Sequence, residues 1–322
     1  MASNNSCYLG IDLGASSVKA GVLSADKQLL STVAVPTARR KRQAVLDAIV
    51  DSARQAVARA HLALTDIAAV GIASPGPIDL NAQVICDSPN IEDWRNVPLG
   101  KILKDALGRP TVLENDANAA ALGEFHLGAG QGTRVMALFT LGSGIGGGVV
   151  IDGQVLHGAH GFAAELGHII VVPGGRLCGC GQHGCAEAYA SANSTVARAT
   201  EALVQHPDSS LAQLDQPITA IDVEQHARRG DALAIEIFDG TAYYLALLSL
   251  NVRAVVDPQM VVLGGGMSHA GDILLTAVRK HFDQQNWHLQ GADRCRIELA
   301  VLGNDAGMIG AALAAAQSPN PS

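Results

Sequence analysis

The order of predicted strands and helices occurs twice along the chain, and this repetition constrains the fold more than any single motif. In the first half, we expect strands at 7–12, 20–24, 29–35, 69–73 and 110–114, with helices at 43–61 and from about 117. In the second half, we expect strands at 134–141, 147–151, 154–157, 260–266 and 296–301, with helices at 187–204, 220–255, 270–283 and from 305. Two successive β-β-β-α-β-α-β units indicate an α/β protein with two lobes and a cleft between them.

Length and composition agree with two lobes that each bury a core. The chain has 322 residues, which favours two domains over one, and 48% of them are hydrophobic while 16% are charged. The net charge of −8 argues against non-specific binding to nucleic acid or to anionic membranes. An anionic substrate therefore has to be bound by local hydrogen-bond donors.

Neither a secretory signal nor a membrane span is expected. The first residues, MASNNSCYLGID, lack a basic region followed by a long apolar stretch. The apolar stretch at 242–256 is short and is interrupted by Asn251 and Arg253. We therefore expect a cytoplasmic protein, in which disulfides are rare and clustered cysteines bind metal or react.

Three of the six cysteines lie within eight positions, in the stretch CGCGQHGC. Cys178, Cys180 and Cys185 supply three thiolates, and His168, ten residues before the first of them, can supply a nitrogen. A Cys3His set is typical of tetrahedral zinc in a structural site. Three alternatives stay open from the residues alone: reduced thiols without metal, a catalytic zinc, and His183 as a ligand in place of His168.

A first candidate phosphate loop is IDLGASSVK at 11–19. Asp12 is predicted at a strand end, where it can hold a hydrated magnesium ion, and the backbone N–H groups that follow can bind phosphate oxygens. An ordinary hairpin turn is the alternative. The residues assigned to the nucleotide in this loop are Asp12, Gly14, Ser16, Ser17 and Lys19.

A second candidate loop is LGSGIGGG at 141–148, whose glycines leave room for a phosphate. No Gly-Lys-Ser/Thr follows, so it is not a P-loop, and a strand follows where a dinucleotide fingerprint needs a helix. A third glycine run, LGGGM at 263–267, suits the flat face of an adenine. The residues assigned to the nucleotide here are Gly142, Ser143, Gly144, Gly146, Gly264 and Gly265.

The stretch ENDANAA at 114–120 supplies a candidate general base. Asp116 is predicted where a strand meets a helix, so it either caps that helix or accepts a proton from a substrate hydroxyl that attacks phosphorus. Asn115 can hydrogen-bond the same substrate. Glu165 and Glu187 lie on either side of the candidate zinc ligands and suit the hydroxyls of a sugar, with solvated helix ends as the alternative.

These motifs resemble those of the ROK family of sugar kinases and sugar-responsive repressors. The resemblance implies a two-lobed actin-like ATPase (ribonuclease H-like) fold with a duplicated βββαβα core, and it covers roughly residues 7–315. Its most specific part is ELGH at 165–168 followed by CGCGQHGCAE at 178–187. One departure is the first loop, usually Asp-x-Gly-Gly-Thr and here Asp-Leu-Gly-Ala-Ser, which bears on the loop geometry around Ala15 and not on the reaction.

The resemblance also assigns roles to residues. It makes Asp116 the catalytic base and implies ATP, Mg²⁺ and a structural Zn²⁺. The sugar contacts that it implies are Gly76, Asn90, Asn115, Asp116, Glu165, His168 and Glu187, and the zinc ligands are His168, Cys178, Cys180 and Cys185. The expected lobes are 1–117 with 306–322, and 118–305, the larger one carrying the zinc loop.

The implied activity is ATP-dependent phosphorylation of a hexose at its 6-hydroxyl. The stretch PNIEDWRNVPL at 89–99 resembles the glucokinase branch and favours glucose, with N-acetylmannosamine or another hexose as the alternative. A transcriptional repressor is disfavoured because the first strand, near residue 7, leaves no room for a helix-turn-helix module. A sugar-binding protein without activity is disfavoured by Asp12 and Asp116. The family further implies a homodimer or homotetramer, with no nucleic-acid or membrane partner.

Overall fold

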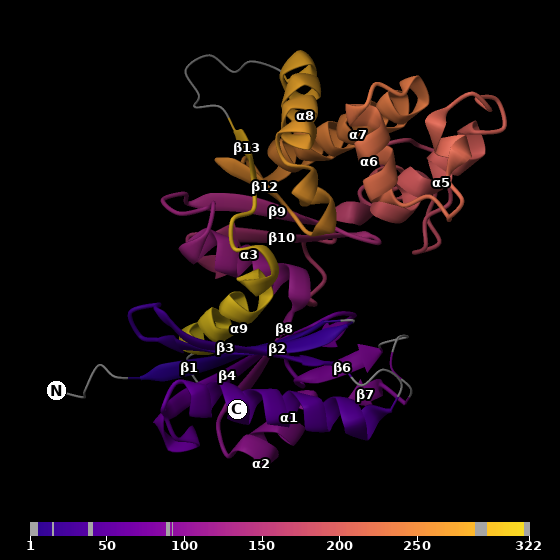
Figure 1. Cartoon of the computed structure of the whole chain (residues 1–322). Coiled ribbons are helices and arrows are strands. Elements are labelled where there is room, and N and C mark those ends of the chain that lie inside the picture. The colour runs from indigo at the N-terminus through magenta and orange to yellow at the C-terminus, as the bar shows by residue number, and fades with distance from the viewer. Residues whose placement is uncertain are drawn as a thin grey trace. The chain divides into compact units, whose positions relative to one another are not determined.

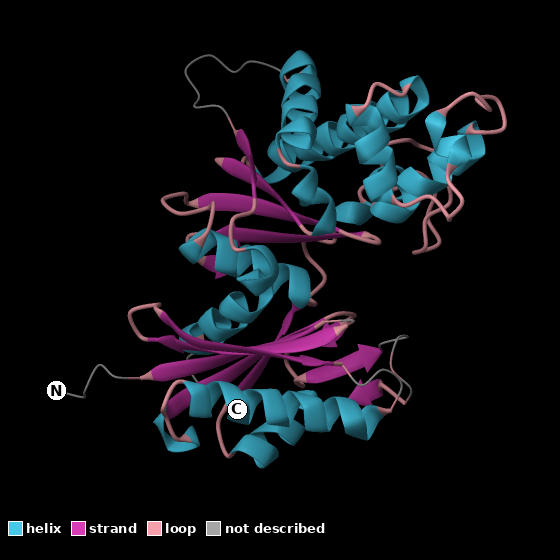
Figure 2. Cartoon of the chain, in the orientation of Figure 1, coloured by secondary structure: helices cyan, strands magenta, loops and turns pink. Residues whose placement is uncertain are grey.

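A computed structural model of the chain describes residues 6–14, 16–37, 41–87, 91, 93–286 and 295–318. Two compact units make up the chain, and neither is continuous in sequence. The first unit comprises Met1–Gln131, Gly148–Ala164 and Leu302–Ser322, and the second comprises Gly132–Gly147 and Glu165–Val301. Both units combine sheet and helix (Figure 2), so the mixed α/β class predicted from the sequence is confirmed.

The first unit is built on a sheet with the strand order β3-β2-β1-β4-β8. Its strands are β1 (Cys7–Leu13), β2 (Ser17–Ser24), β3 (Leu29–Pro36), β4 (Ile67–Ser74) and β8 (Thr111–Asn115). The strands β1, β2 and β3 pair in antiparallel fashion, whereas β1, β4 and β8 are parallel. The parallel strands therefore end together at one edge of the sheet, where ligands bind in open α/β sheets.

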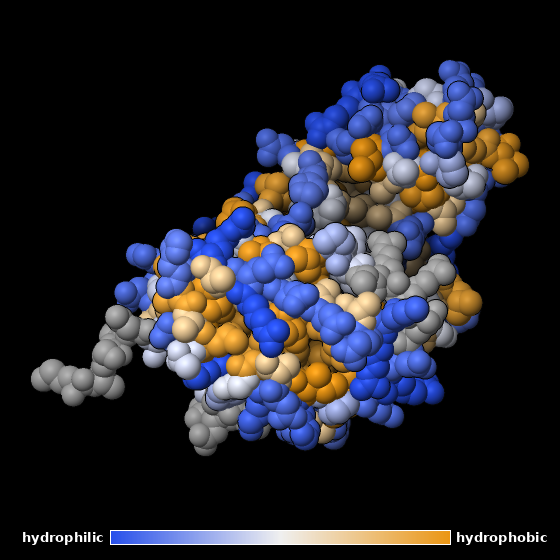
Figure 3. Space-filling view, turned by 60° about the horizontal axis from the view of Figure 1, so that its bottom comes forward, coloured by the Kyte–Doolittle hydropathy of each residue, from blue (hydrophilic) through white to orange (hydrophobic). Residues whose placement is uncertain are grey.

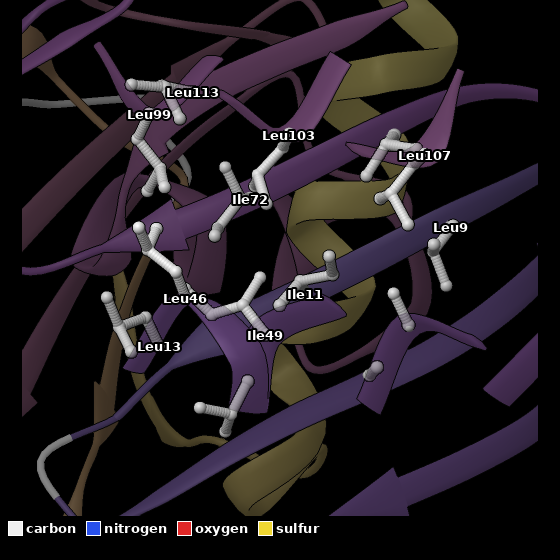
Figure 4. Close-up of a cluster of buried hydrophobic side chains, with 14 of the residues drawn as sticks. Leu9, Ile11, Leu13, Leu46, Ile49, Ile72, Leu99, Leu103, Leu107 and Leu113 are labelled. Carbon is white, nitrogen blue, oxygen red and sulfur yellow. The ribbon is translucent and has the colours of Figure 1, made fainter. Parts of the chain in front are cut away.

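Two helices, α1 (Arg42–Arg59) and α2 (Leu99–Leu107), cover one face of this sheet (Figure 1). Buried residues on α1 recur at helical spacing, and the helix packs mainly against β2 and β3 and to a smaller extent against β1. Figure 4 shows this core, with Leu9, Ile11 and Leu13 of β1 labelled beside Leu46, Ile49, Ile72, Leu99, Leu103, Leu107 and Leu113. The outer face of the unit carries hydrophilic and hydrophobic residues interspersed with one another (Figure 3).

The helices α3 (Asp116–Leu127) and α9 (Ala306–Gln317) complete the first unit, and α9 packs on the opposite face of β1 and β4. The approach is close enough that a side chain on the strand is excluded. A Cβ atom at Gly71 of β4 would overlap the carbonyl oxygen of Ala311, and one at Gly310 would overlap that of Ala119. Glycine at these two positions therefore lets the C-terminal helix lie directly on the sheet and on α3.

A small antiparallel sheet, β5-β6-β7, extends the first unit and was not predicted from the sequence. Its strands are β5 (Ile78–Asp79), β6 (Val84–Asp87) and β7 (Arg95–Val97). Trp94, immediately before β7, is 1% exposed and belongs to the main core. The helix α2 was also missed, although Leu99, Leu103 and Leu107 recur at the spacing of a helix face.

The second unit contains most of a sheet with the strand order β11-β10-β9-β12-β13. These strands are β9 (Val135–Leu141), β10 (Ile145–Ile151), β11 (Gln154–Val155), β12 (Met260–Gly264) and β13 (Arg296–Leu299). The strands β9, β12 and β13 are parallel, and β10 pairs with β11 in antiparallel fashion. Each strand expected in this half is present, with ends that differ by a few residues.

Helices account for the rest of the second unit. They are α4 (Glu187–Ala190), α5 (Ala192–Ala202), α6 (Ala220–Arg228), α7 (Ala232–Val256) and α8 (Asp272–Gln285). Single-turn 3₁₀ helices lie at Leu64–Asp66, Leu166–His168, Ser210–Gln213, Gly266–Ala270 and Gly303–Asp305.

The helix expected at 220–255 is two helices. Gly230 has a φ of 90°, and the side chain of Asp231 then caps α7 by accepting from the N–H of Ala234 at 2.9 Å. Likewise, Ser191 separates α4 from α5 and caps α5. By length and composition α7 could cross a membrane, but 56% of its apolar window is buried inside the protein, as in the core helix of a folded domain.

Candidate active site

Two carboxylates lie at the carboxyl edge of the first sheet. Asp12 is near the end of β1, and Asp116 follows β8 directly. Only β4 lies between β1 and β8, so the two backbone positions are about 10 Å apart at the usual strand spacing. The sequence predicted both residues, and the sheet topology brings them to one edge.

Burial raises the pKa of both carboxyl groups. Burial raises the pKa of Asp12 to about 7, with a further contribution from the negative charge of Asp116 and an opposing one from Lys19. Burial likewise raises the pKa of Asp116, although hydrogen bonds to its carboxylate oppose the shift. A carboxylate of raised pKa is a stronger base than a solvated one, which suits proton abstraction near neutral pH.

The start of α3 shows which residue caps the helix. Asn115 is the N-cap, because its Oδ1 atom accepts from the N–H groups of Ala117 at 2.9 Å and Asn118 at 3.2 Å. Asp116 is the first helical residue, and its Oδ1 atom accepts from the N–H of Ala117 at 2.8 Å. Asn115 is therefore the N-cap of α3, so helix capping does not explain the presence of Asp116.

The first candidate phosphate loop connects β1 to β2. The N–H of Gly14 donates to the carbonyl of Ser17 at 3.0 Å, and Ser16 is exposed. Lys19 is engaged elsewhere: its Nζ atom donates to the carbonyl of Asn304 at 2.9 Å and lies 3.2 Å from a carboxylate oxygen of Asp305. The geometry around Ala15 lies outside the described residues.

Two further residues expected to contact the sugar belong to the first unit. Gly76 follows β4 in a turn with a φ of 93°, where a Cβ atom would lie 2.5 Å from the carbonyl oxygen of Asp87. Only glycine fits that conformation without strain. Asn90, together with part of the stretch 89–99, lies outside the described residues.

In the second unit, the four predicted metal ligands converge. The ligand atoms of His168, Cys178, Cys180 and Cys185 all lie within 4.8 Å of one another. The Nδ1 atom of His168 is 3.6 Å from the sulfur of Cys178, and the sulfurs of Cys180 and Cys185 are 3.7 Å apart. His183 lies outside this group, with its Nδ1 atom 3.0 Å from the carbonyl oxygen of Gly175.

These distances fit a tetrahedral ion. Zn–S bonds of about 2.3 Å and Zn–N bonds of about 2.0 Å, at the tetrahedral angle, place two sulfurs about 3.8 Å apart and a nitrogen and a sulfur about 3.5 Å apart. Four protein ligands fill the coordination sphere of zinc, which is the pattern of structural sites. Since Nδ1 of His168 faces the sulfurs, its Nε2 atom is left to contact another ligand.

Glu187 connects this cluster to the second glycine loop. Its Oε2 atom accepts from the N–H of Ile145 at 2.8 Å, and its Oε1 atom lies 3.5 Å from the sulfur of Cys178. A Cβ atom at Gly144 would overlap Oε2, so the carboxylate requires glycine at that position. Glu165, which is exposed, precedes the single helical turn that ends at His168.

A pocket of about 460 Å³ lies in the second unit beside the glycine loops. It is lined by Gly142, Ser143, Ala192, Thr219, Ala220, Ile221, Glu224, Phe238, Gly266, Met267, His269 and Ala270. Its mainly apolar walls and its volume suit a nucleoside. Gly142 and Ser143 were predicted, whereas Gly264 and Gly265 lead into the lining residue Gly266 without lining the pocket themselves.

No sequence motif indicated most of the other pocket residues. Ile221 is 66% exposed, so it belongs to no predicted core. Thr219 was not distinguishable as a pocket residue, although it caps α6 in a capping box with Asp222. Met267 directly follows the third glycine run, and that adjacency was the one available signal.

The fold and these two groups of residues define a mixed α/β protein of the actin-like ATPase class. The chain matches the ROK family over residues 8–318. It is 38% identical to a glucokinase of Halalkalibacterium halodurans, over 97% of this chain and 96% of that protein. The chain therefore belongs to the ROK family.

Solved structures agree with this assignment. A ROK hexokinase from Thermus thermophilus is 37% identical with a TM-score of 0.84, and the match covers 96% of this chain and 98% of that one. A ROK family glucokinase from Streptomyces griseus, solved in complex with glucose and AMPPNP, is 35% identical with a TM-score of 0.80, over 97% of this chain and 100% of that one. The two-lobed actin-like ATPase fold predicted from the sequence is thereby confirmed.

Proposed function

We propose that this protein transfers the γ-phosphoryl group of ATP to the 6-hydroxyl of a hexose, with glucose as the preferred substrate. The observation that carries the proposal is the pair Asp12 and Asp116 at the carboxyl edge of the first sheet, where burial and mutual repulsion raise the pKa of Asp12 to about 7. The glucokinase relatives and the related structure with glucose and AMPPNP support both substrates.

Asp116 acts as the general base in this scheme. As the sugar hydroxyl attacks phosphorus, one oxygen of its carboxylate accepts the hydroxyl proton, while Oδ1 remains tied to the N–H of Ala117. Asn115 adds a side-chain amide that can donate to the same sugar. Because α3 begins here, the positive end of its dipole faces the developing negative charge.

Asp12 is the residue proposed to hold a hydrated Mg²⁺ ion. A carboxylate and water oxygens are the ligands that Mg²⁺ prefers, and the bound ion would neutralise charge on the ATP phosphates. Asp12 has to lose its proton first, so the raised pKa makes metal binding compete with protons near neutral pH. The pocket lined by Ile221 and Met267 is the proposed adenosine site.

His168, Cys178, Cys180 and Cys185 are proposed to hold a structural zinc ion, and the fit of their distances to a tetrahedral site supports this. The ion would fix the two ends of the loop between His168 and Cys185. Glu187, in contact with Cys178, and His168, through Nε2, would then present fixed acceptors and donors to the sugar. Glu165 is proposed as a further sugar contact.

Glucose is favoured over N-acetylmannosamine because every proposed sugar contact is polar and matched to hydroxyls. A site built to hydrogen-bond a hydroxyl rejects an analogue that leaves its polar groups unpaired. Competition of the two sugars in one reaction tests this preference: a higher kcat/KM for N-acetylmannosamine would overturn the choice of sugar and leave the phosphoryl-transfer scheme intact. A cytoplasmic location and a homodimeric or homotetrameric state remain predictions from the sequence.

The substitution Asp116→Asn tests the reaction scheme. It keeps the size of the side chain and its bond to the N–H of Ala117 but removes proton acceptance, so we expect kcat to fall about 10²–10⁴-fold with little change in the KM for sugar. A coupled assay of ADP release, with glucose and ATP both saturating, measures the effect. Near-normal turnover by a folded variant would contradict the assignment of the base.

A further inference from the structure

The side chain of Glu114, next to the proposed sugar-binding Asn115, has no role in the scheme above although it is a buried charge. It is 4% exposed and is the fourth residue of β8. Its Oε1 atom accepts from the backbone N–H of Asn115 at 2.9 Å and from the Nδ2 atom of Asn118 at 3.2 Å. Its Oε2 atom lies 2.7 Å from the Nε2 atom of His157.

His157 supplies the counter-charge for this carboxylate. It lies beyond β11 in the first unit, and its side chain is 39% exposed. The hydrogen bond to Glu114 raises the pKa of His157, against the opposing effect of burial. The imidazole therefore stays protonated to a higher pH than a free histidine, and in that state its charge balances that of the carboxylate.

We propose that Glu114 and His157 are positioning residues that fix the turn carrying Asn115 and Asp116. The donors bound to Oε1 come from Asn115 and Asn118, on the two sides of Asp116 in the sequence. One carboxylate oxygen thus holds both ends of the turn, and His157 holds the carboxylate. The inference rests on the proposed function, since it concerns the same catalytic base.

Stability alone gives no reason for a charge at this place. Replacing a buried ion pair by apolar residues of similar size is often neutral or stabilising, so an apolar core would serve the fold as well. An apolar side chain at 114 could not, however, accept from the N–H of Asn115. A carboxylate without a partner would accept this hydrogen bond, but it would place an uncompensated negative charge two residues from Asp116. His157 can compensate that charge.

The same pair anchors a second segment. The carbonyl oxygen of His157 accepts from the N–H of Ala163 at 3.1 Å, which closes the loop between them. The chain continues directly from this loop to Glu165, a proposed sugar contact. The bond between Glu114 and His157 therefore ties the turn at Asp116 to the segment that leads to Glu165.

Four variants test the inference: Glu114→Ala, Glu114→Gln, His157→Ala and His157→Gln. Loss of the acceptor in Glu114→Ala frees the turn, and misplacement of a base by about 1 Å can reduce the rate about 10²-fold, so we expect kcat to fall about 10- to 100-fold. The KM for ATP should stay within about twofold, because the adenosine pocket is built from other residues.

The conservative variants should rescue much of this loss. Glu114→Gln keeps one oxygen for the N–H of Asn115 and can turn its amide to a neutral His157, so its kcat should return to within about fivefold of the wild type. His157→Gln keeps a donor for Oε2 and should likewise exceed His157→Ala. A role confined to folding would change the melting temperature of these variants without this order in kcat.

The substitution His281→Ala is the matched control, because it removes a comparable pair, in which Nε2 lies 3.0 Å from a carboxylate oxygen of Asp239 in the second unit. It should leave kcat unchanged. Each variant is assayed with glucose and ATP at a fixed margin below its own melting temperature.

Wild-type turnover of glucose is measured first, and its absence overturns the proposed function together with this inference. With an active wild type, a folded Glu114→Ala variant within twofold of normal kcat overturns the inference alone, as does an equal loss in the His281→Ala control. If Glu114→Ala does not fold, the comparison of His157→Ala with His157→Gln decides: the expected order supports the inference, and equal kcat values overturn it.

Discussion

Replacing Asp12 should stabilise the protein while removing its activity. The pKa of Asp12 is raised from 3.8 to about 7, first by burial and then by the charge of Asp116. The folded state therefore binds this proton more tightly than the unfolded state does. As pH rises from about 4 to 7 the folded state loses stability relative to the unfolded chain, and above pH 7 the whole penalty is present.

The magnitude follows from the shift. A difference of about three pKa units corresponds to about 4 kcal/mol at about 1.36 kcal/mol per unit. Because Asp12 is only partly enclosed, solvent screening reduces this value, and we take about half, 2 kcal/mol, as the gain of Asp12→Asn at pH 8. For a chain of 322 residues, with an unfolding entropy of about 2.1 cal/mol/K per residue, that gain raises the melting temperature by about 3 °C. At pH 4 the two proteins should melt together.

Thermal denaturation of wild type and Asp12→Asn between pH 4 and 8.5 measures this gap, and a coupled assay measures the loss of activity. Millimolar Mg²⁺ should stabilise the wild type at pH 8 and leave the variant unchanged, since the ion binds the ionised carboxylate. The control is Asp105→Asn, which removes an exposed ion pair on α2 between Oδ2 of Asp105 and Nζ of Lys101, 2.7 Å apart. Its loss should change the free energy of unfolding by about 0.5 kcal/mol or less. A gap that does not depend on pH, or a variant less stable at pH 8, would refute the reasoning.

Three further outcomes are expected. Purified protein should contain about one zinc ion per chain, and Cys180→Ser should lose it, with a lower melting temperature and a higher KM for glucose but not for ATP; metal-free wild type with full activity would contradict this. Gly144→Ala should raise the KM for glucose about tenfold by displacing Glu187, whereas Gly179→Ala, where a Cβ atom meets nothing within 4 Å, should not, and equal effects would remove the role given to Gly144. Lowering the pH from 8 to 6 should raise the Mg²⁺ concentration for half-maximal activity by about tenfold per unit below pH 7, because protons occupy Asp12, and a titration with Mg²⁺ at both values should show no change if Asp12 is not the ligand.

The sequence predicted the long-range plan of the fold better than its local detail. Strands buried on both faces, such as β1 and β4, are continuous apolar runs bounded by turn residues, and these were found. The strands β5, β6 and β7 are two to four residues long, which is too short to show a periodic signal. The break before α7 was missed because apolar residues recur at helical spacing up to 227 and again from 232, although the residues between them are polar apart from Gly230.

The candidate site divides in the same way. Residues that share one short motif, such as Asp116 with Asn115 or the three cysteines, were visible because their chemistry is local in sequence. Glu114 and His157 are 43 positions apart, and their contact is created by the pairing of strands, so no local pattern could have paired them. The adenosine pocket has the same origin, because its lining residues come from five separate stretches of the second unit.

The position of α9 on the first sheet has a consequence for how the protein is made. The last strand of that sheet, β8, ends at Asn115, and α9 begins about 190 residues later at Ala306. At about 5–20 residues per second, the ribosome needs about 10–40 s to synthesise the interval. During that time α9 cannot yet cover its face of β1 and β4. This is the face on which Gly71 leaves room for the helix. The sheet that is synthesised first is therefore completed only at the end of synthesis, when its final helix arrives.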